Sequence, residues 1–539
     1  MRVYYLYDDN RRNVCSQAGI DDTSAYIPAL LYFLGVTGQP IELDLLGSLQ
    51  ETDILIAVRT QLPALPCTVI SFAAEQSWEQ VLEKKWYGTI QTCESHAPVL
   101  PIFAPLYPLA DTGEEILAVG SMNGGDTMPA IVRSGKRYEF AFDLPASVWY
   151  SGDGFEQSEG INGFQQVRVP DMRPLPMDFD TKTLPYNDIL CGILRDILSA
   201  AGVPMFHTLP PLEDGSIPEL ALHFSGDDDA TSSEVNRTAA LHMESRGLPY
   251  HINAMPLDAD RFIMTRQEFE DLQTHGCEFG LHTNFYGVPF SAETQNAQAE
   301  LYVRVFGTEP VTNVNHCLIR DSSTAKRLEW LEALGIIGDN DMLGEVDPHD
   351  VNAFNVTGYG FGTSFPRFTC AGADQKNRLI RTVEIANTYY EPRLDPVKYP
   401  DETPIRRYLD ISAERGAYAQ FFMHPHYFNE SFGNQAMVHA ALDLIQKHCR
   451  EKGYRIWYTT TNTIAHFWKD RADSVLQKRG NGEYYLNAKC PLVIQLPNGF
   501  HKVFINGKEF NSTEIMLCGK CVNMVSIRSA GEYFLRFDR

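Results

Sequence analysis

The stretch Leu222-His-Phe-Ser-Gly-Asp-Asp-Asp229 runs from an apolar strand directly into three consecutive acidic residues. Adjacent carboxylates repel one another and raise one another's pKa, so a folded chain needs a cation or a shared proton to keep them together. A metal ion supplies such a cation, and a neighbouring carboxylate can then act as a general base. The same residues also fit a solvated loop or a helix N-terminus, where acidic side chains interact well with the helix dipole.

Three further short apolar runs lead into polar clusters that contain histidine. The runs are Cys277–Phe285, Val314–Cys317 and Phe421–His426, and their histidines are His282, His316, His424 and His426. A single histidine in such a place is more often a hydrogen-bonded structural residue than a ligand. Four strand ends that each present Asp or His, however, together offer the ligand types that a divalent cation prefers.

Polar clusters at strand ends are typical of α/β barrels, whose active sites lie at the carboxyl ends of the strands. Residues 176–471 alternate helical patterns with short apolar runs, so we predict a barrel over this range. A proline-rich stretch precedes it, because Pro-X-Pro segments resist helix formation and favour a linker. Its prolines are Pro170, Pro174, Pro176 and Pro185.

Residues 1–175 predict a separate α/β unit. Runs rich in branched residues favour strands, and Ser24–Leu34 has helical spacing after acidic and hydroxyl residues that can cap a helix. This alternation favours a parallel, doubly wound sheet of flavodoxin-like type. The expected strands are Val3–Tyr7, Ile54–Val58 and Thr68–Phe72, followed by Leu117–Ser121 and Ala130–Leu144 around the hairpin signal Asn123-Gly124-Gly125-Asp126.

Residues 472–539 change character and predict a small β-sandwich. Asn498-Gly499 and Asn506-Gly507 are signals for tight hairpin turns. The expected strands are Tyr484–Leu486, Leu492–Leu496, Lys502–Ile505 and Val522–Ile527. The chain is therefore expected to contain three domains.

The composition excludes several classes of function. The 539 residues carry 45 Lys plus Arg and 69 Asp plus Glu, a net charge of −24, which argues against a nucleic-acid or anionic-membrane binder. The 11 scattered cysteines favour reduced thiols in a cytosol. The first residues lack a secretory pattern, and the apolar stretch Ile27–Val36 is too short to span a bilayer. We therefore expect a cytoplasmic protein with no membrane partner.

The order of the polar clusters resembles that of the polysaccharide deacetylase family of carbohydrate esterases, over about residues 184–467. The resemblance implies a distorted (β/α) barrel and a divalent metal, with zinc as the expected ion. Ser225-Gly226-Asp227-Asp228-Asp229 stands in the place of the family's first motif, and His282-Thr283 in that of the second. By this match Asp227 is the general base, and Asp228 and His282 are metal ligands.

Two departures from the family pattern change the expected ligand set. Tyr286 stands where the second motif has another histidine, and Asn315-His316-Cys317 stands where the third motif has Arg and Pro. We expect His316 to replace the missing ligand, so the metal would be held by Asp228, His282 and His316 with one position open. Phe422-Met423-His424 matches the last motif, which implies that His424 is the general acid, with His426 as its alternate.

Further residues are candidates for the site without an assigned role: Asp229, Tyr286, His426 and Arg367. Arg367 closes the stretch Gly360–Arg367, which can contact a sugar, although an ordinary turn is the commoner interpretation. Residues 1–175 loosely resemble class I glutamine-amidotransferase-like domains without their nucleophile, so no chemistry is assigned to them.

The function expected from these motifs is a metal-dependent hydrolase of polysaccharide deacetylase type, acting on an acetylated sugar or a related C–N bond. One alternative is a non-catalytic relative that binds carbohydrate, which the substitution at Tyr286 suggests. Another is a glycosidase on a related barrel, with two acids flanking the scissile bond. The sequence leaves the oligomeric state open.

Overall fold

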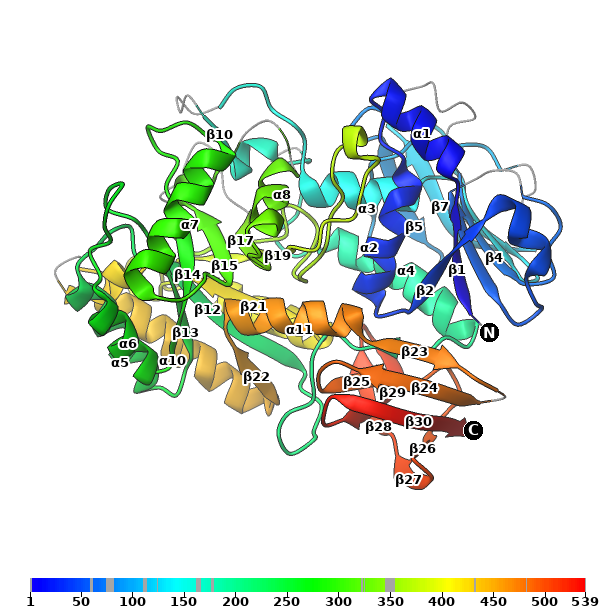
Figure 1. The fold of residues 1–539 in the computed structure, drawn as a ribbon. Coiled ribbons are helices and arrows are strands. Elements are labelled where there is room, and N and C mark those ends of the chain that lie inside the picture. Colours follow the sequence, from blue (N-terminus) through cyan, green and yellow to red (C-terminus); the bar gives the residue numbers. More distant parts are fainter. Residues whose placement is uncertain are drawn as a thin grey trace.

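The computed structural model describes the chain in several ranges. These are residues 2–58, 62–73, 82–109, 114–123, 125–160, 166–175, 179–320, 323, 325–344, 354–430, 433–480 and 482–538. Residue 176, where the second unit was predicted to begin, and Gly124 of the expected hairpin lie outside these ranges. Figure 1 shows the N-terminal sheet in blue beside a green-to-gold body of strands and helices, with the C-terminal strands in red beneath.

The N-terminal sheet joins a parallel half to an antiparallel half, in the order β2-β1-β3-β4-β9-β8-β7-β5-β6. The parallel strands are β1 (Val3–Tyr7), β2 (Gly38–Glu42), β3 (Ile54–Val58), β4 (Thr68–Phe72) and β9 (Arg137–Phe140). The antiparallel strands are β5 (Gly88–Thr92), β6 (Leu100–Ile102), β7 (Glu115–Met122) and β8 (Met128–Ser134). The three strands expected first in this unit are confirmed, and all five residues of β3 are buried, as in a parallel strand covered on both faces.

Two expected elements of this unit differ from the structure. The helix expected over Ser24–Leu34 is a 3₁₀ turn (Thr23–Tyr26) followed by α2 (Ile27–Leu34), because the Asp22 carboxylate accepts from the Ser24 backbone and caps an earlier, tighter turn. The strand expected over Ala130–Leu144 is wrong as one element. Gly135 adopts a left-handed turn with φ +59°, which folds the run into β8 and β9, and α3 (Leu144–Asp153) then begins.

The central body is an α/β unit built on one curled sheet in which the neighbours along β20-β21-β12-β13-β14-β15-β17-β19 pair in parallel. Its strands are β12 (Leu220–Asp227), β13 (Tyr250–Ala254), β14 (Cys277–Thr283), β15 (Thr312–Asn315), β17 (Gly338–Leu343), β19 (Val383–Asn387), β20 (Tyr389–Tyr390), β21 (Tyr418–Phe422) and β22 (Ile456–Thr459). Parallel pairing brings the carboxyl ends of these strands to one edge.

Helices connect most of these strands, as parallel pairing requires. They are α5 (Ser233–Glu244), α6 (Arg266–Thr274), α7 (Ala292–Phe306), α8 (Lys326–Ala333), α9 (Thr403–Glu414), α10 (Gln435–Lys452) and α11 (Thr461–Asp473). Each helix buries one face against the sheet or a neighbouring helix, and Trp468 of α11 is fully buried. Figure 1 shows α11 lying between the central sheet and the C-terminal strands.

The C-terminal residues form two antiparallel sheets that share one apolar core, which includes Leu486, Ile494 and Leu535. One sheet contains β11 (Met205–Phe206), β25 (Leu492–Gln495), β29 (Lys520–Ile527) and β28 (Thr513–Leu517). The other contains β23 (Val475–Lys478), β24 (Glu483–Ala488), β30 (Gly531–Asp538), β26 (Lys502–Ile505) and β27 (Lys508–Asn511). The expected strands of this tail are confirmed, but β11 comes from residues far upstream.

A buried arginine on α11 joins the three regions. The Arg471 guanidinium donates to the carbonyl oxygens of Tyr32, Phe33, Phe206 and His207 at 2.7–3.1 Å. The first two carbonyls belong to the last turn of α2, where a cation is favoured by the helix dipole. Gly35 follows α2 with φ +69°, and a Cβ there would lie 2.2 Å from the Phe206 carbonyl oxygen, so only glycine fits.

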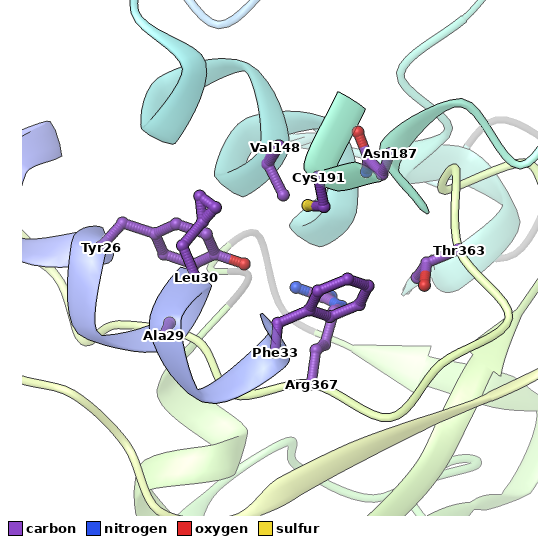
Figure 2. Close-up of a pocket in the computed structure, with 9 residues that line it drawn as sticks. All are labelled: Tyr26, Ala29, Leu30, Phe33, Val148, Asn187, Cys191, Thr363 and Arg367. Carbon is purple, nitrogen blue, oxygen red and sulfur yellow. The ribbon is translucent and has the colours of Figure 1, made fainter. Parts of the chain in front are cut away.

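A small cavity lies at the junction of the N-terminal and central regions (Figure 2). Figure 2 shows Tyr26 and Phe33 facing Cys191 of α4 (Tyr186–Ala200), with the Arg367 side chain beside the Phe33 ring. The cavity holds about 10 Å³, which is room for a single water molecule and excludes an organic ligand. It is therefore a packing feature of the junction.

None of the helices in the described ranges is both long enough and apolar enough to span a membrane.

Replacing Arg471 by methionine is expected to lower the free energy of unfolding by about 3 kcal/mol or more, because four buried carbonyl groups would lose their donor. Urea denaturation followed by circular dichroism measures the change. Arg471→Lys keeps the charge but cannot reach four acceptors. Its free energy of unfolding should therefore lie between those of the wild type and Arg471→Met. The role assigned to this side chain is wrong if Arg471→Met unfolds at the wild-type urea concentration.

Candidate metal and catalytic centre

The carboxyl edge of the central sheet gathers acidic and histidine side chains from four strand ends. Asp227 is the last residue of β12, and His282 is the last but one of β14. His316 follows β15 directly, and His424 lies two residues beyond β21. The strand ends that were picked out in the sequence therefore meet in space.

Three donor atoms lie close enough to share one ion. His282 Nε2 is 3.1 Å from His316 Nδ1 and 3.3 Å from Asp229 Oδ1, and His316 Nδ1 is 3.2 Å from the same oxygen. A tetrahedral zinc with bonds of about 2.0–2.1 Å holds its ligand atoms about 3.3 Å apart. The triangle formed by Asp229, His282 and His316 has these dimensions, so the set is a possible metal site.

The orientation of His282 also suits a ligand. Its Nδ1 lies 3.3 Å from the Val314 carbonyl oxygen, to which an N–H at that position donates. In the neutral ring Nε2 then directs its lone pair at Asp229 and His316, as metal-ligating histidines do when the other nitrogen donates to a carbonyl group.

A hydrogen-bonded cluster without metal is the other arrangement that these distances allow. Although burial lowers the pKa of His316, its hydrogen bond with Asp229 raises that pKa to about 10. Burial raises the pKa of Asp229, but the charge of His424 and the hydrogen bonds from His282 and His316 lower it below its ordinary range. In both arrangements an ionised Asp229 is held by positive charge or by hydrogen-bond donors.

Asp227 and Asp228 take different positions from Asp229. Asp227 is buried, accepts a 2.9 Å hydrogen bond from the Asn253 side-chain amide, and has Oδ2 3.5 Å from His282 Nε2; burial raises its pKa. Asp228 Oδ1 accepts from the backbone N–H groups of Met255 and Ala230 at 2.9 and 3.1 Å, and Asp228 does not belong to the groups of donor atoms that lie close enough to share an ion in the described residues. Burial raises the pKa of Asp228 to about 7. The structure thus places Asp229, and not the expected Asp228, with the two histidines.

A buried carboxylate orients His424. Glu391 Oε1 lies 2.5 Å from His424 Nδ1 and also accepts from the His424 backbone N–H at 3.0 Å. Its other oxygen lies 3.2 Å from the Arg393 guanidinium. His424 Nε2 faces Asp229 Oδ2 at 3.5 Å. Burial lowers the pKa of His424, but the charge of Asp229 and the hydrogen bond to Glu391 raise it to about 9.

Strained backbone concentrates around this centre. Five residues other than glycine that follow its strands have φ between 47° and 56°, in the left-handed region. They are Asp229, Ala230, Cys317, Leu318 and Glu391. Such conformations persist only where the surroundings enforce them, and they cluster at functional sites. The left-handed turn at Asp229 and Ala230 comes directly after Asp228, whose Oδ1 accepts hydrogen bonds from two backbone N–H groups.

Residues at the end of the N-terminal unit hold two loops of the centre. The Arg168 guanidinium donates to the Cys317 carbonyl oxygen at 2.7 Å, beside His316. The Gln166 amide donates to the carbonyl oxygens of Phe285 and Val288 at 3.1 and 3.3 Å. The strand β10 (Val167–Arg168) pairs with β16 (Ile319–Arg320), so this segment is tied to the loop that carries His316.

The remaining candidate residues lie outside the triangle. Tyr286 is 60% exposed, unlike the buried His282. The ring of His426 lies 5.1 Å from that of His424, and burial together with the His424 charge lowers the pKa of His426 to about 4. Arg367 is buried and pairs with Asp153 of α3 and Glu384 of β19, at the junction of Figure 2.

Three residues of the centre were missed in the sequence: Glu391, Asn253 and Arg168. Glu391 follows the short strand Tyr389–Tyr390, so the pattern of a strand ending in an acid could have found it. Asn253 is a buried polar residue in β13, opposite Asp227 in the register. Arg168 carries no local signal, because its partner is 149 residues away.

Comparisons with known proteins give only distant structural likenesses. A scan of family models finds no match, and a search of curated proteins finds none either. Solved structures that match include a protein from Mycobacterium smegmatis assigned as a polysaccharide deacetylase (14% identity, 49% of this chain and 95% of that chain, TM-score 0.33). The chitin deacetylase of the fungal pathogen Colletotrichum lindemuthianum matches at 11% identity, with 48% and 89% of the two chains covered and a TM-score of 0.27.

The peptidoglycan deacetylase PdaC from Bacillus subtilis matches at 14% identity, with 47% of this chain and 93% of that chain covered and a TM-score of 0.26. These three structures are described as deacetylases, and each covers about half of this chain. The function proposed below rests on the geometry of the centre and not on these superpositions.

Replacing Glu391 by glutamine is expected to lower the pKa of His424, because a neighbouring negative charge is removed. Histidine proton NMR of the metal-free protein measures the titration. Glu402→Gln, at a partly exposed ion pair with Arg406, is the matched control and should leave His424 unchanged. An unaltered His424 titration in Glu391→Gln would contradict the assigned pairing.

The same pair makes a prediction about stability. Because the pKa of His424 in the folded protein is about 9, against an ordinary value near 6.5, its protonated form is favoured by folding. This contribution is fully present below about pH 6.5 and is lost as the pH rises through about 9. The loss of stability in His424→Gln should therefore be larger at pH 6 than at pH 10, as measured by urea denaturation of the metal-free protein.

Proposed function

We propose that this protein is a metal-dependent hydrolase of the deacetylase type. The observation that carries the proposal is the triangle of donor atoms from Asp229, His282 and His316, with sides of 3.1–3.3 Å, beside a buried carboxylate and a Glu–His pair. Two imidazole nitrogens and one carboxylate oxygen suit zinc, and three protein ligands leave a fourth position open.

The chain's own residues then divide the remaining work. A divalent ion at this position supplies Lewis acidity for an acyl carbonyl group and for water. Asp227, whose pKa is raised by burial, takes a proton from the attacking water, and Asn253 holds its carboxylate in place. His424, oriented by Glu391 at its Nδ1, gives a proton from Nε2 to the leaving amine or alcohol. Arg168 keeps the loop of His316 in position.

The substrate that we propose is an N- or O-acetylated sugar. Support comes from the order of the motifs in the sequence, which resembles that of carbohydrate esterases. The exposed Tyr286 follows β14 at the same edge of the sheet as the centre. An exposed aromatic face of this kind can pack against a sugar ring.

The metal site predicts a clear order among variants. Asp229→Asn, His282→Ala and His316→Ala should each lower zinc affinity by more than the roughly 10–100-fold that is typical of outer-shell changes. Asp228→Asn should retain the metal more strongly than Asp229→Asn, because Asp229 supplies the oxygen nearest the two histidines and two backbone N–H groups already occupy Asp228 Oδ1. Titration with a chromophoric zinc chelator measures the affinities, and His275→Ala is a surface control.

Equal zinc affinity in the wild type and in all three ligand variants would refute this centre. Loss of zinc in Asp228→Asn together with its retention in Asp229→Asn would restore the ligand set first expected from the sequence.

If the proposed activity is right, the protein releases acetate from acetylated chito-oligosaccharides or acetylated xylan. Asp227→Asn should lower kcat by about 10²–10⁴-fold while leaving zinc bound, because it removes a general base without touching a ligand. An enzyme-coupled acetate assay measures the rate. Release of reducing sugar without acetate would indicate the glycosidase, and binding of the glycan without any turnover would indicate the non-catalytic relative.

A further inference from the structure

A polar cavity lined by none of the residues of the candidate centre lies where the three regions of the chain meet. It holds about 40 Å³, enough for about three water molecules or one small oxyanion. Its walls come from α2, α4, β11, the segment after α9, α11 and the turn between β28 and β29. Its polar lining includes Arg195, Arg415, Arg471, His207 and Asp188.

Positive charge dominates this cavity. Arg471 is buried, and its guanidinium group donates to four backbone carbonyl groups. In the described residues no carboxylate lies within ion-pair distance of this guanidinium group. The Arg415 guanidinium lies 3.9 Å from the Cys518 sulfur, and the Arg195 guanidinium lies 3.6 Å from Asp196 Oδ1. Three arginines thus line one cavity, and Asp196, beside Arg195, is the carboxylate within ion-pair distance of any of them in the described residues.

Asp188 is the carboxylate that lines the chamber. Its Oδ2 accepts from the Ser364 backbone N–H and hydroxyl at 3.2 and 3.4 Å, while its Oδ1 is buried with no hydrogen-bond partner. Burial raises the pKa of Asp188 to about 7, so this carboxyl group can also carry a proton and donate it to a ligand. One acid against three arginines leaves the chamber with an excess of positive charge.

We propose that this junction cavity binds a small tetrahedral oxyanion of the phosphate class. Arg471 is buried without a carboxylate partner in the described residues, and an anion in the cavity would compensate its charge together with those of the half-buried Arg195 and Arg415. Guanidinium groups suit oxyanions because their planar donors pair with two oxygens. Burial lowers the pKa of His207 to about 3, so its ring is neutral. His207 therefore lines the cavity as a polar group without charge.

The ion can be free, or it can be the phosphate group of a larger molecule. Gln495 lines this cavity and also a larger neighbouring groove of about 340 Å³ that includes Asn498 and Lys520. A phosphomonoester could place its phosphate group among the arginines and the rest of the molecule in this groove.

Thermal denaturation of the full chain at constant ionic strength tests the proposal. Sodium phosphate or sulfate, compared with sodium chloride, should raise the midpoint in a saturable way. Arg195→Gln and Arg415→Gln should each weaken the affinity by about tenfold, the value of one lost charge-assisted hydrogen bond. Arg237→Gln, at an exposed ion pair on α5, is the matched control and should bind as the wild type does. Tighter binding of glycerol phosphate than of inorganic phosphate would identify a phosphomonoester as the source.

A second measurement does not depend on the variants folding. Cys518 lines the cavity, so phosphate should slow its alkylation by iodoacetamide, measured by mass spectrometry on the wild-type chain. The exposed Cys93 is the internal control and should react at an unchanged rate. A midpoint that rises without saturation, or equally with chloride, and an unchanged rate at Cys518 would overturn the proposal.

Discussion

Desolvation of acidic side chains is the constraint on which the central unit depends. Strand β12 delivers three consecutive carboxyl groups to the sheet edge, and Asp227 and Asp228 are almost wholly buried there. Each is compensated differently: by the Asn253 amide, by the backbone N–H groups of Met255 and Ala230, and, for Asp229, by His282, His316 and His424. The positions of these surrounding groups follow from that need, because an uncompensated buried charge is strongly destabilising.

The supporting groups come from distant parts of the chain. Glu391 reaches His424 from β20, Arg168 reaches the His316 loop from the end of the N-terminal region, and Arg471 connects α2, β11 and α11. The N-terminal region therefore contributes to the rigidity of the centre even though no chemistry is assigned to it. Buried arginines recur in these roles because one planar guanidinium can donate to several acceptors at once.

Much of the local structure could be predicted from the sequence. The strands at Val3–Tyr7, Ile54–Val58, Thr68–Phe72 and Lys502–Ile505 have the bounds that their branched residues indicated. Positions near turns were less predictable, since Gly135 splits one expected strand into two and Asp22 caps an unexpected 3₁₀ turn. These differences arise from single capping or left-handed residues, which hydrophobic periodicity does not register.

For the centre, the sequence by itself determined which strand ends carry polar groups, because an apolar run that closes on Asp or His is a local pattern. It did not determine which of the three adjacent aspartates faces the histidines. The tertiary structure decided which aspartate faces them. Backbone N–H groups fix Asp228 Oδ1, and the left-handed turn at Asp229 places the Asp229 carboxylate beside the histidines. The tertiary structure also decided the partners of His424 and of the Cys317 carbonyl beside His316, since Glu391 and Arg168 approach from 33 and 149 residues away. Contacts over such separations depend on strand register and on packing between regions, and neither of these is written in any one segment of the chain.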